Sequence, residues 1–149
     1  TTARLLPLWA WKMKPSAVLW MVICTSLWAC NAWAGPRSDY MLNCQGCHLP
    51  DGSGVIGKVP SFADLGDFLT VDGGREFIVR VPGTAQSKLS DANTARVLNW
   101  ILGNFSASSL PAEFVPYSRE EVAVLRSVRL DDVGSERARL IRKIEESGS

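Results

Sequence analysis

The stretch Cys44-Gln45-Gly46-Cys47-His48 places two cysteines three positions apart and a histidine directly after the second one. Residues three apart on a helical turn share one face, so both thiols would point in the same direction. His48 follows at once and brings an imidazole beside the two sulfur atoms. This is the strongest signal in the chain, and it decides which fold we expect the flanking segments to form.

The spacing Cys-x-x-Cys-His is the attachment signature for c-type haem. Both thiols can reach the two vinyl groups along one edge of a porphyrin, and His48 then lies under the iron. Attachment of this kind usually takes place outside the cytoplasm. The sequence therefore predicts one covalent haem c, bound by Cys44 and Cys47, with His48 as an axial iron ligand.

Three other interpretations of this stretch are weaker. A zinc site would need a fourth ligand, and no further cysteine or histidine follows residue 34, so only a carboxylate or water could supply it. A thioredoxin-like redox pair would follow a strand in a βαβ unit, and no such strand precedes Cys44. A disulfide across so tight a loop would leave His48 without a role.

The first 34 residues have the pattern of an export signal. An apolar run over residues 17–29 follows Lys14, and Ala32-Trp33-Ala34 is a small-x-small site of the kind that signal peptidase cuts. The run is short for a membrane span. We therefore expect cleavage after Ala34 and a periplasmic protein. A retained anchor, or lipidation at Cys30, is the alternative that would place the chain on a membrane.

Removal of this leader changes the charge balance. It leaves 13 basic and 15 acidic residues, a net charge of about −2, and only two of the four cysteines. A nucleic-acid partner would need a basic face, so this balance gives it no support. Met13 is an ordinary start for such a leader, which makes residues 1–12 a candidate for a misplaced gene start.

Around the motif, residues 36–105 resemble the class I family of monohaem c-type cytochromes. The family has a short helix before the motif, where Ser38 supplies a cap ahead of apolar residues. It also has a proline loop about a dozen residues after the histidine, and Pro60 stands there. The resemblance implies that the Pro60 carbonyl accepts a hydrogen bond from the second ring nitrogen of His48, orients the ring and makes the iron more electron-rich.

The resemblance continues into a C-terminal helix that closes the haem pocket. Ser90 is its predicted cap, and apolar residues follow at helical spacing. The family would place Trp100 near the haem edge, although packing alone would also explain a tryptophan there. A shorter helix is expected over residues 74–79, capped by Asp72.

Two arginines and three apolar residues of the segment around that shorter helix also have expected roles. Arg75 and Arg80 are candidate partners of the haem propionates. The apolar residues are expected to face the core or the porphyrin, and they are Phe77, Ile78 and Val81.

A departure from the family concerns the second axial ligand. Class I cytochromes usually supply a methionine six or seven residues before the Ser-Asp pair that opens the last helix, and counting back from Ser90 gives Thr84. Met41 is the only methionine outside the leader. It lies three residues before Cys44, and we interpret it as helix packing.

An open or weakly bound distal position is therefore favoured. Alternatives are a lysine, with Lys88 or Lys58 as weak candidates, an oxygen or amide donor from residues 83–88, and a ligand from a partner protein. Peroxidase chemistry would also want a distal acid–base group. The nearby aspartates are expected to act in solvation or capping, and they are Asp64, Asp67 and Asp72.

We divide the chain into a signal peptide (1–34), a cytochrome c domain (35–105), a linker (106–117) and a helical C-terminal extension (118–149). The extension has seven basic and seven acidic residues. Ser118 opens a capping box, and Ser135 begins a second amphipathic stretch. We expect the extension to pack over the domain, with docking to a dehydrogenase or oxidase as the alternative.

Together these features predict an all-α class I cytochrome c fold with a helical C-terminal extension. The expected function is one-electron transfer in the periplasm, with redox partner proteins as donor and acceptor and no catalysis on a substrate. The alternatives are binding or sensing of a small ligand at an open haem iron, and a haem subunit of a periplasmic dehydrogenase or oxidase complex. In each case the protein sets potential, access and partner choice.

Overall fold

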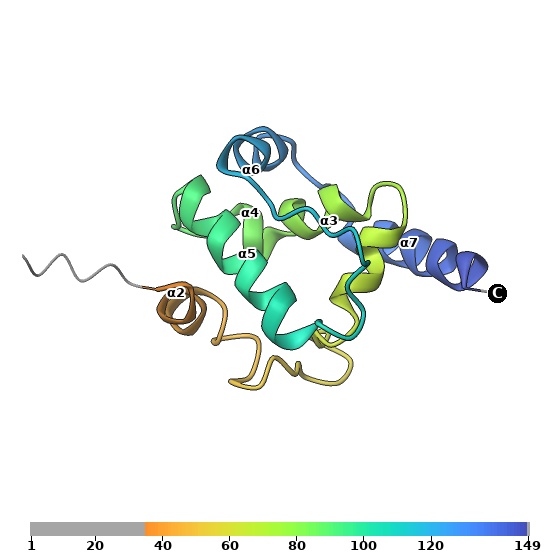
Figure 1. Cartoon of the computed structure of the whole chain (residues 1–149), viewed down its shortest axis with the longest axis horizontal. Coiled ribbons are helices and arrows are strands. Elements are labelled where there is room, and N and C mark those ends of the chain that lie inside the picture. Colours follow the sequence, from red (N-terminus) through yellow and green to blue (C-terminus); the bar gives the residue numbers. More distant parts are fainter. Residues whose placement is uncertain (1–34, 149) are drawn as a thin grey trace, which may run out of the picture. The chain divides into compact units, whose positions relative to one another are not determined.

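The computed structural model describes residues 35–148, and the leader predicted over residues 1–34 lies outside that range. Its helices are α2 (Pro36–Asn43), the 3-10 helix η2 (Leu65–Thr70), α3 (Gly74–Arg80), α4 (Pro82–Ala85), α5 (Asp91–Phe105), α6 (Arg119–Arg126) and α7 (Val133–Ser147). Within the described range no strand forms, and one isolated antiparallel bridge joins Val55 to Val59. The prediction of an all-α fold is confirmed (Figure 1). No helix between residues 35 and 148 is long and apolar enough to cross a membrane.

The first described helix, α2, begins earlier than predicted, so the expected cap at Ser38 is wrong. It starts at Pro36, with Gly35 as N-cap and no side-chain hydrogen bond at the cap. Proline suits the first helical position because its fixed φ matches the helix and its missing N–H would have had no partner there. At the other end the Cys44 N–H still donates to the Tyr40 carbonyl at 2.8 Å. The helix therefore leads directly into the cysteine motif.

A small aromatic cluster joins α2 to α5. Tyr40 is 1% exposed and packs with Val97 of α5. Its ring centroid lies 5.3 Å from that of Trp100 and 5.3 Å from that of Phe105. Because α2 turns Tyr40 inward, its neighbour Met41 points outward and is 54% exposed. The predicted packing role of Met41 is therefore wrong.

The long helix α5 has apolar residues on two faces. Its N-terminus is capped as predicted, because the Ser90 hydroxyl accepts a hydrogen bond from the Asn93 N–H at 3.3 Å. The face that carries Val97 meets α2. The face that carries Leu98 and Leu102 joins a second cluster with residues of α3, α6 and α7. One helix thereby connects the motif to the rest of the core.

The start of α3 differs from the prediction, because Asp72 does not cap it. Gly73 is the N-cap, with φ +90°, and no side chain bonds to the helix end. A Cβ on Gly74 would lie 1.8 Å from the Phe68 carbonyl oxygen. Phe68 and Phe77 also stack, with ring centroids 5.5 Å apart. Close packing on η2 sets this helix start, and local capping does not.

The C-terminal extension shares the core of residues 35–105. Tyr117, Val122 of α6 and Leu140 of α7 are all buried in the same cluster as Leu98 and Phe77. The contacts include α6 with α3 and α5, and α7 with η2 and α3.

The caps of the two extension helices came out differently. The Ser118 hydroxyl accepts a hydrogen bond from the Glu121 N–H at 3.1 Å, so the cap predicted for α6 is confirmed. The second stretch starts earlier than the predicted Ser135, because Asp132 caps α7 and accepts from the Ser135 N–H.

Candidate cofactor-attachment site

The cysteine motif forms a helical turn that continues α2. The His48 N–H donates to the Cys44 carbonyl at 3.0 Å, and the Cys47 N–H donates to the same carbonyl at 3.1 Å. Both thiols are free, with Cys44 half-buried and Cys47 exposed. The turn therefore has the backbone form that the spacing predicts, and neither sulfur atom is committed to a disulfide.

Burial and neighbouring charge keep the Cys44 sulfur protonated. Burial raises the pKa of the Cys44 thiol, and the nearby Asp39 carboxylate and Cys47 raise it further. Asp39 lies in α2, and its side chain is itself buried. A protonated thiol is the form that adds to a vinyl group without first being lost to oxidation, because the thiolate is the reactive species.

His48 is half-buried and has a fixed orientation. Its ring stacks on Phe62 with a centroid distance of 3.8 Å and an interplanar angle of 19°. Burial lowers the pKa of His48, while the backbone of Pro60 acts in the opposite direction and raises it. The neutral imidazole that burial favours is the form that binds a metal ion.

One ring nitrogen of His48 meets the requirement that the family would impose. Nδ1 is buried and finds no fully aligned hydrogen-bond partner among residues 35–148. The Pro60 carbonyl is close enough to influence the ring without completing that bond. An orphaned Nδ1 beside a carbonyl leaves Nε2 as the nitrogen available to iron, so these residues fit a haem.

The loop after His48 is held by packing that requires glycine. The Tyr40 hydroxyl donates to the Leu49 carbonyl. Gly52 has φ +78°, and a Cβ there would lie 2.4 Å from the Phe105 ring. Val55 and Val59 exchange backbone hydrogen bonds of 2.9 and 2.8 Å. These contacts position Pro60 next to the imidazole.

The structure also brings Trp100 into the neighbourhood of the motif. Trp100 and Cys44 pack against the same small cluster, which is formed around Tyr40. Trp100 is half-buried, and its ring is perpendicular to that of Phe105, at 86°. Its predicted place at the haem edge stays a prediction, since aromatic packing accounts for the contacts seen.

The candidate distal ligands lie apart from one another. Thr84 is half-buried in α4, whereas Lys88 and Lys58 are exposed on different loops. Among residues 35–148 no group of three or more His, Cys, Asp or Glu side chains could hold a metal ion. The distal ligand therefore remains a matter of prediction.

Arg126, which the sequence analysis did not single out, organises the segment that follows Thr84. Its guanidinium donates to the carbonyls of Ala85 (3.1 Å), Ser87 (2.8 Å) and Leu89 (2.9 Å). It also pairs with the Asp91 carboxylate at 2.9 Å. Arg126 is the last residue of α6, and nothing in its local sequence indicates partners 35 or more positions away.

Arg75 and Arg80 contact the extension. Arg75 pairs with Glu121 and lies 4.1 Å above the centre of the Tyr117 ring. Arg80 donates to the backbone carbonyls of Val128 and Arg129, at 3.1 and 2.8 Å. The structure therefore does not bring these two arginines to the motif, and the propionate role predicted for them is not supported.

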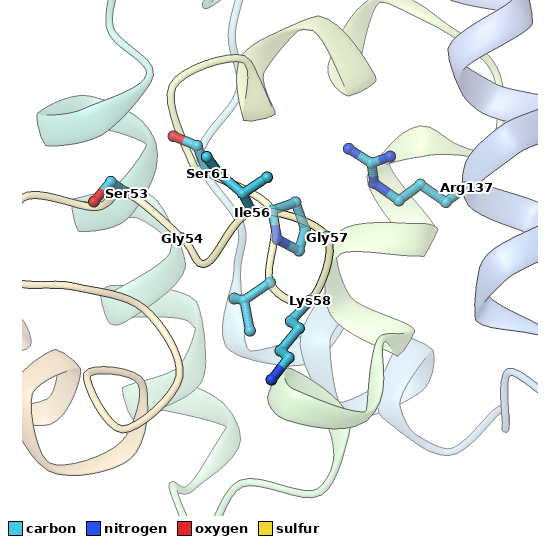
Figure 2. A pocket seen from close by; sticks show the side chains of 9 residues that line it. Ser53, Gly54, Ile56, Gly57, Lys58, Ser61 and Arg137 are labelled. Atoms are coloured by element: carbon cyan, nitrogen blue, oxygen red, sulfur yellow. The ribbon is translucent and has the colours of Figure 1, made fainter.

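A pocket of about 620 Å³ lies beside the loop between His48 and Phe62. Its lining comes almost wholly from that loop, and the residues are Ser53, Gly54, Ile56, Gly57, Lys58, Val59, Pro60 and Ser61, with Arg137 of α7. Figure 2 shows Arg137 extending from α7 toward the loop. Neither cysteine lines the pocket, and Pro60 connects it to the imidazole.

Comparison with known proteins gives two relatives. Cytochrome c-552 of Thermus thermophilus is 30% identical over 106 residues, which covers 58% of this chain and 81% of that protein. A second cytochrome c-552, from another record of the same species, is 30% identical over 106 residues, covering 72% of its length. No family model matches the chain.

Proposed function

The chain belongs to the class I monohaem c-type cytochromes, and on this basis we propose that it carries single electrons between protein partners in the periplasm. Proteins of this family are electron-transfer proteins that bind one covalent haem c. The observation that carries the proposal is the turn of Cys44 to His48, where two free thiols adjoin an oriented imidazole.

The residues of this turn would hold the haem. Cys44 and Cys47 would form the two thioether bonds, and His48 would bind the iron through Nε2. When bound, the haem supplies an iron that alternates between ferrous and ferric states. Axial ligation, hydrogen bonding and burial are the means by which a protein tunes that potential.

The surrounding side chains keep this site rigid. Phe62 fixes the plane of the His48 ring, and the Tyr40 hydroxyl anchors Leu49, the residue that follows the histidine. A carrier gains from such rigidity, because little must rearrange when its charge changes. Neither contact offers a group for chemistry on a substrate.

Exposed apolar residues near the motif suit contact with other proteins. Leu42 of α2, Leu49, and Val55 and Ile56 of the following loop are exposed, Ile56 fully so. Apolar side chains gathered on a surface are a common feature of interaction sites. We propose that a redox partner docks on this face, because it adjoins the two cysteines that would hold the haem.

The periplasmic location is part of the proposal and rests on the leader. The signal-peptide pattern ends at Ala34, and covalent haem attachment normally occurs on exported chains. Amino-terminal sequencing of protein expressed from the full chain in a Gram-negative host tests this. A mature chain that begins at Gly35 is expected, and a chain that retains residues 17–29 would contradict it.

A second candidate function is reversible binding of a small ligand at the iron. It is favoured by one observation, which is that Thr84 occupies the position where the family usually has methionine. Threonine is a weak iron ligand compared with a thioether or an imidazole. Rapid binding of carbon monoxide to the ferrous protein would support this second function.

Electron exchange with a probe protein tests the main proposal. The reduced, haem-loaded protein is mixed with an oxidised small c-type cytochrome in a stopped-flow instrument, and both absorbances are followed. We expect complete second-order exchange with transfer of one electron per haem. Exchange that is slow at every protein concentration, together with rapid carbon monoxide binding, would replace electron transfer by the ligand-binding function.

A further inference from the structure

The pocket beside the Pro60 loop has the charge of an anion site. Its charged lining residues are Lys58 and Arg137, and no carboxylate lines it. The hydroxyl groups of Ser53 and Ser61 also line it. The remaining wall is glycine, proline and aliphatic side chain. A negatively charged group of moderate size would therefore find two cations and hydroxyl groups here.

Arg137 differs from the other arginines of the extension that face the core. Arg126 pairs with Asp91 at 2.9 Å, and Arg139 pairs with Glu136 at 2.6 Å. Among the residues that the structure describes, Arg137 forms no ion pair. It is half-buried, with its guanidinium 6.0 Å from the centre of the Phe68 ring. A half-buried guanidinium is costly to leave without an anionic partner.

Covalent haem brings two carboxylates to this region. The propionate groups of a porphyrin lie away from the vinyl groups, so attachment through Cys44 and Cys47 directs the propionates away from the cysteines. Pro60 lines the pocket and acts on the His48 ring, so the pocket adjoins the iron ligand without containing the thiols. Arg75 and Arg80 contact the extension, which leaves Arg137 as the arginine at this pocket.

We propose that Arg137 of α7 is the counter-ion of a haem propionate, so that the C-terminal extension completes the haem site. A guanidinium suits this role because its planar donors match a carboxylate. Lys58 lines the same pocket but is exposed, which makes it the weaker partner. The inference rests on the covalent haem and not on the electron-carrier role.

The pH profile of the haem midpoint potential tests this assignment. An ionised propionate stabilises ferric iron, so the potential falls as the pH rises through the propionate pKa. A cation beside the propionate lowers that pKa. In haem-loaded Arg137→Gln we expect the fall to move to higher pH by about one to three units. Charged neighbours that stay in place are Lys58 and the Glu136–Arg139 pair.

A matched control lies on the same helix. Arg142 is exposed on α7, and Arg142→Gln removes the same charge without touching the pocket. We expect its profile to match that of the unmodified protein. If the Arg137→Gln profile also coincides with that of the unmodified protein, or if both variants move it equally, the assignment is overturned.

A conservative variant covers the case in which Arg137→Gln does not fold. Arg137→Lys keeps the charge but loses the planar pair of donors. We expect a smaller displacement in the same direction, and no displacement would count against the contact. A covalently attached haem with an unchanged profile would remove this inference and leave the proposed function intact.

Discussion

Both oxygens of the Glu121 carboxylate accept hydrogen bonds from the guanidinium of Arg75, 46 positions earlier in the chain. The bond from Arg75 Nη2 measures 2.8 Å. It joins α3 to α6, and Arg75 also donates to the Val115 carbonyl at 2.8 Å. A segment that a minimal cytochrome fold does not require is thereby attached to the core by a bidentate ion pair, the stronger kind of charge contact.

This pair predicts a loss of stability in acid. The Arg75 hydrogen bond lowers the pKa of Glu121 below its ordinary 4.5. A lowered pKa contributes stability that is complete above the ordinary value and is lost as the pH falls through the folded value. We expect Glu121→Gln to unfold at a free energy about 1 kcal/mol lower than the unmodified protein near neutral pH.

Urea denaturation of the haem-loaded protein across acidic pH measures this difference. The gap between Glu121→Gln and the unmodified protein should close as the pH drops well below 4.5. Glu120→Gln is the control, because Glu120 is exposed on the same helix. A gap that stays constant down to acid would show that the carboxylate charge does not matter.

A second prediction concerns Arg126, whose guanidinium bonds to three backbone carbonyls and to Asp91. Arg126→Gln leaves those partly buried acceptors without donors, so we expect a loss of about 2–4 kcal/mol in unfolding free energy. Arg129→Gln should cost less than about 0.5 kcal/mol, since the Arg129–Asp131 pair is exposed to solvent. Equal effects in thermal unfolding would contradict the role given to Arg126.

Two glycines should respond to alanine in opposite directions. Gly74→Ala places a methyl group 1.8 Å from the Phe68 carbonyl oxygen, so α3 must move away from η2. Gly103→Ala meets nothing within 4 Å in α5 and should gain about 0.5–1 kcal/mol from helix propensity. Unfolding curves measured side by side check both signs, and a stable Gly74→Ala would mean that the helices approach less closely.

The docking face predicts a change in electron exchange without a change in folding. Ile56→Asp puts a charge on the fully exposed loop residue next to the motif, so exchange with a probe cytochrome should slow severalfold. Val124→Asp is the control, because Val124 is 66% exposed on α6. If both variants exchange electrons at the unmodified rate, partners do not use the loop that carries Ile56.

The parts of the structure that were predictable from sequence depend on neighbouring residues. The motif from Cys44 to His48 is five residues long, and its turn follows from its own spacing. Ser90 and Ser118 cap their helices because the bonds they form reach only three residues ahead.

The parts that were missed depend on distant contacts. The start of α3 is set by Gly74 against Phe68, and the partners of Arg75 and Arg80 lie 40 or more positions away. No local pattern distinguishes an arginine that bonds to a remote carbonyl from one that faces solvent. Arg137 escaped notice for the same reason, since only the fold brings α7 to the Pro60 loop.

The most direct test of the central claim is a potentiometric titration, followed by visible absorbance, of protein matured with the c-type haem attachment machinery. We predict one reversible transition that fits a single electron per chain and disappears when Cys44 and Cys47 are both replaced by serine. Protein that carries no haem after maturation, or a transition that persists in the double variant, would contradict the assignment of this chain as a covalent haem electron carrier.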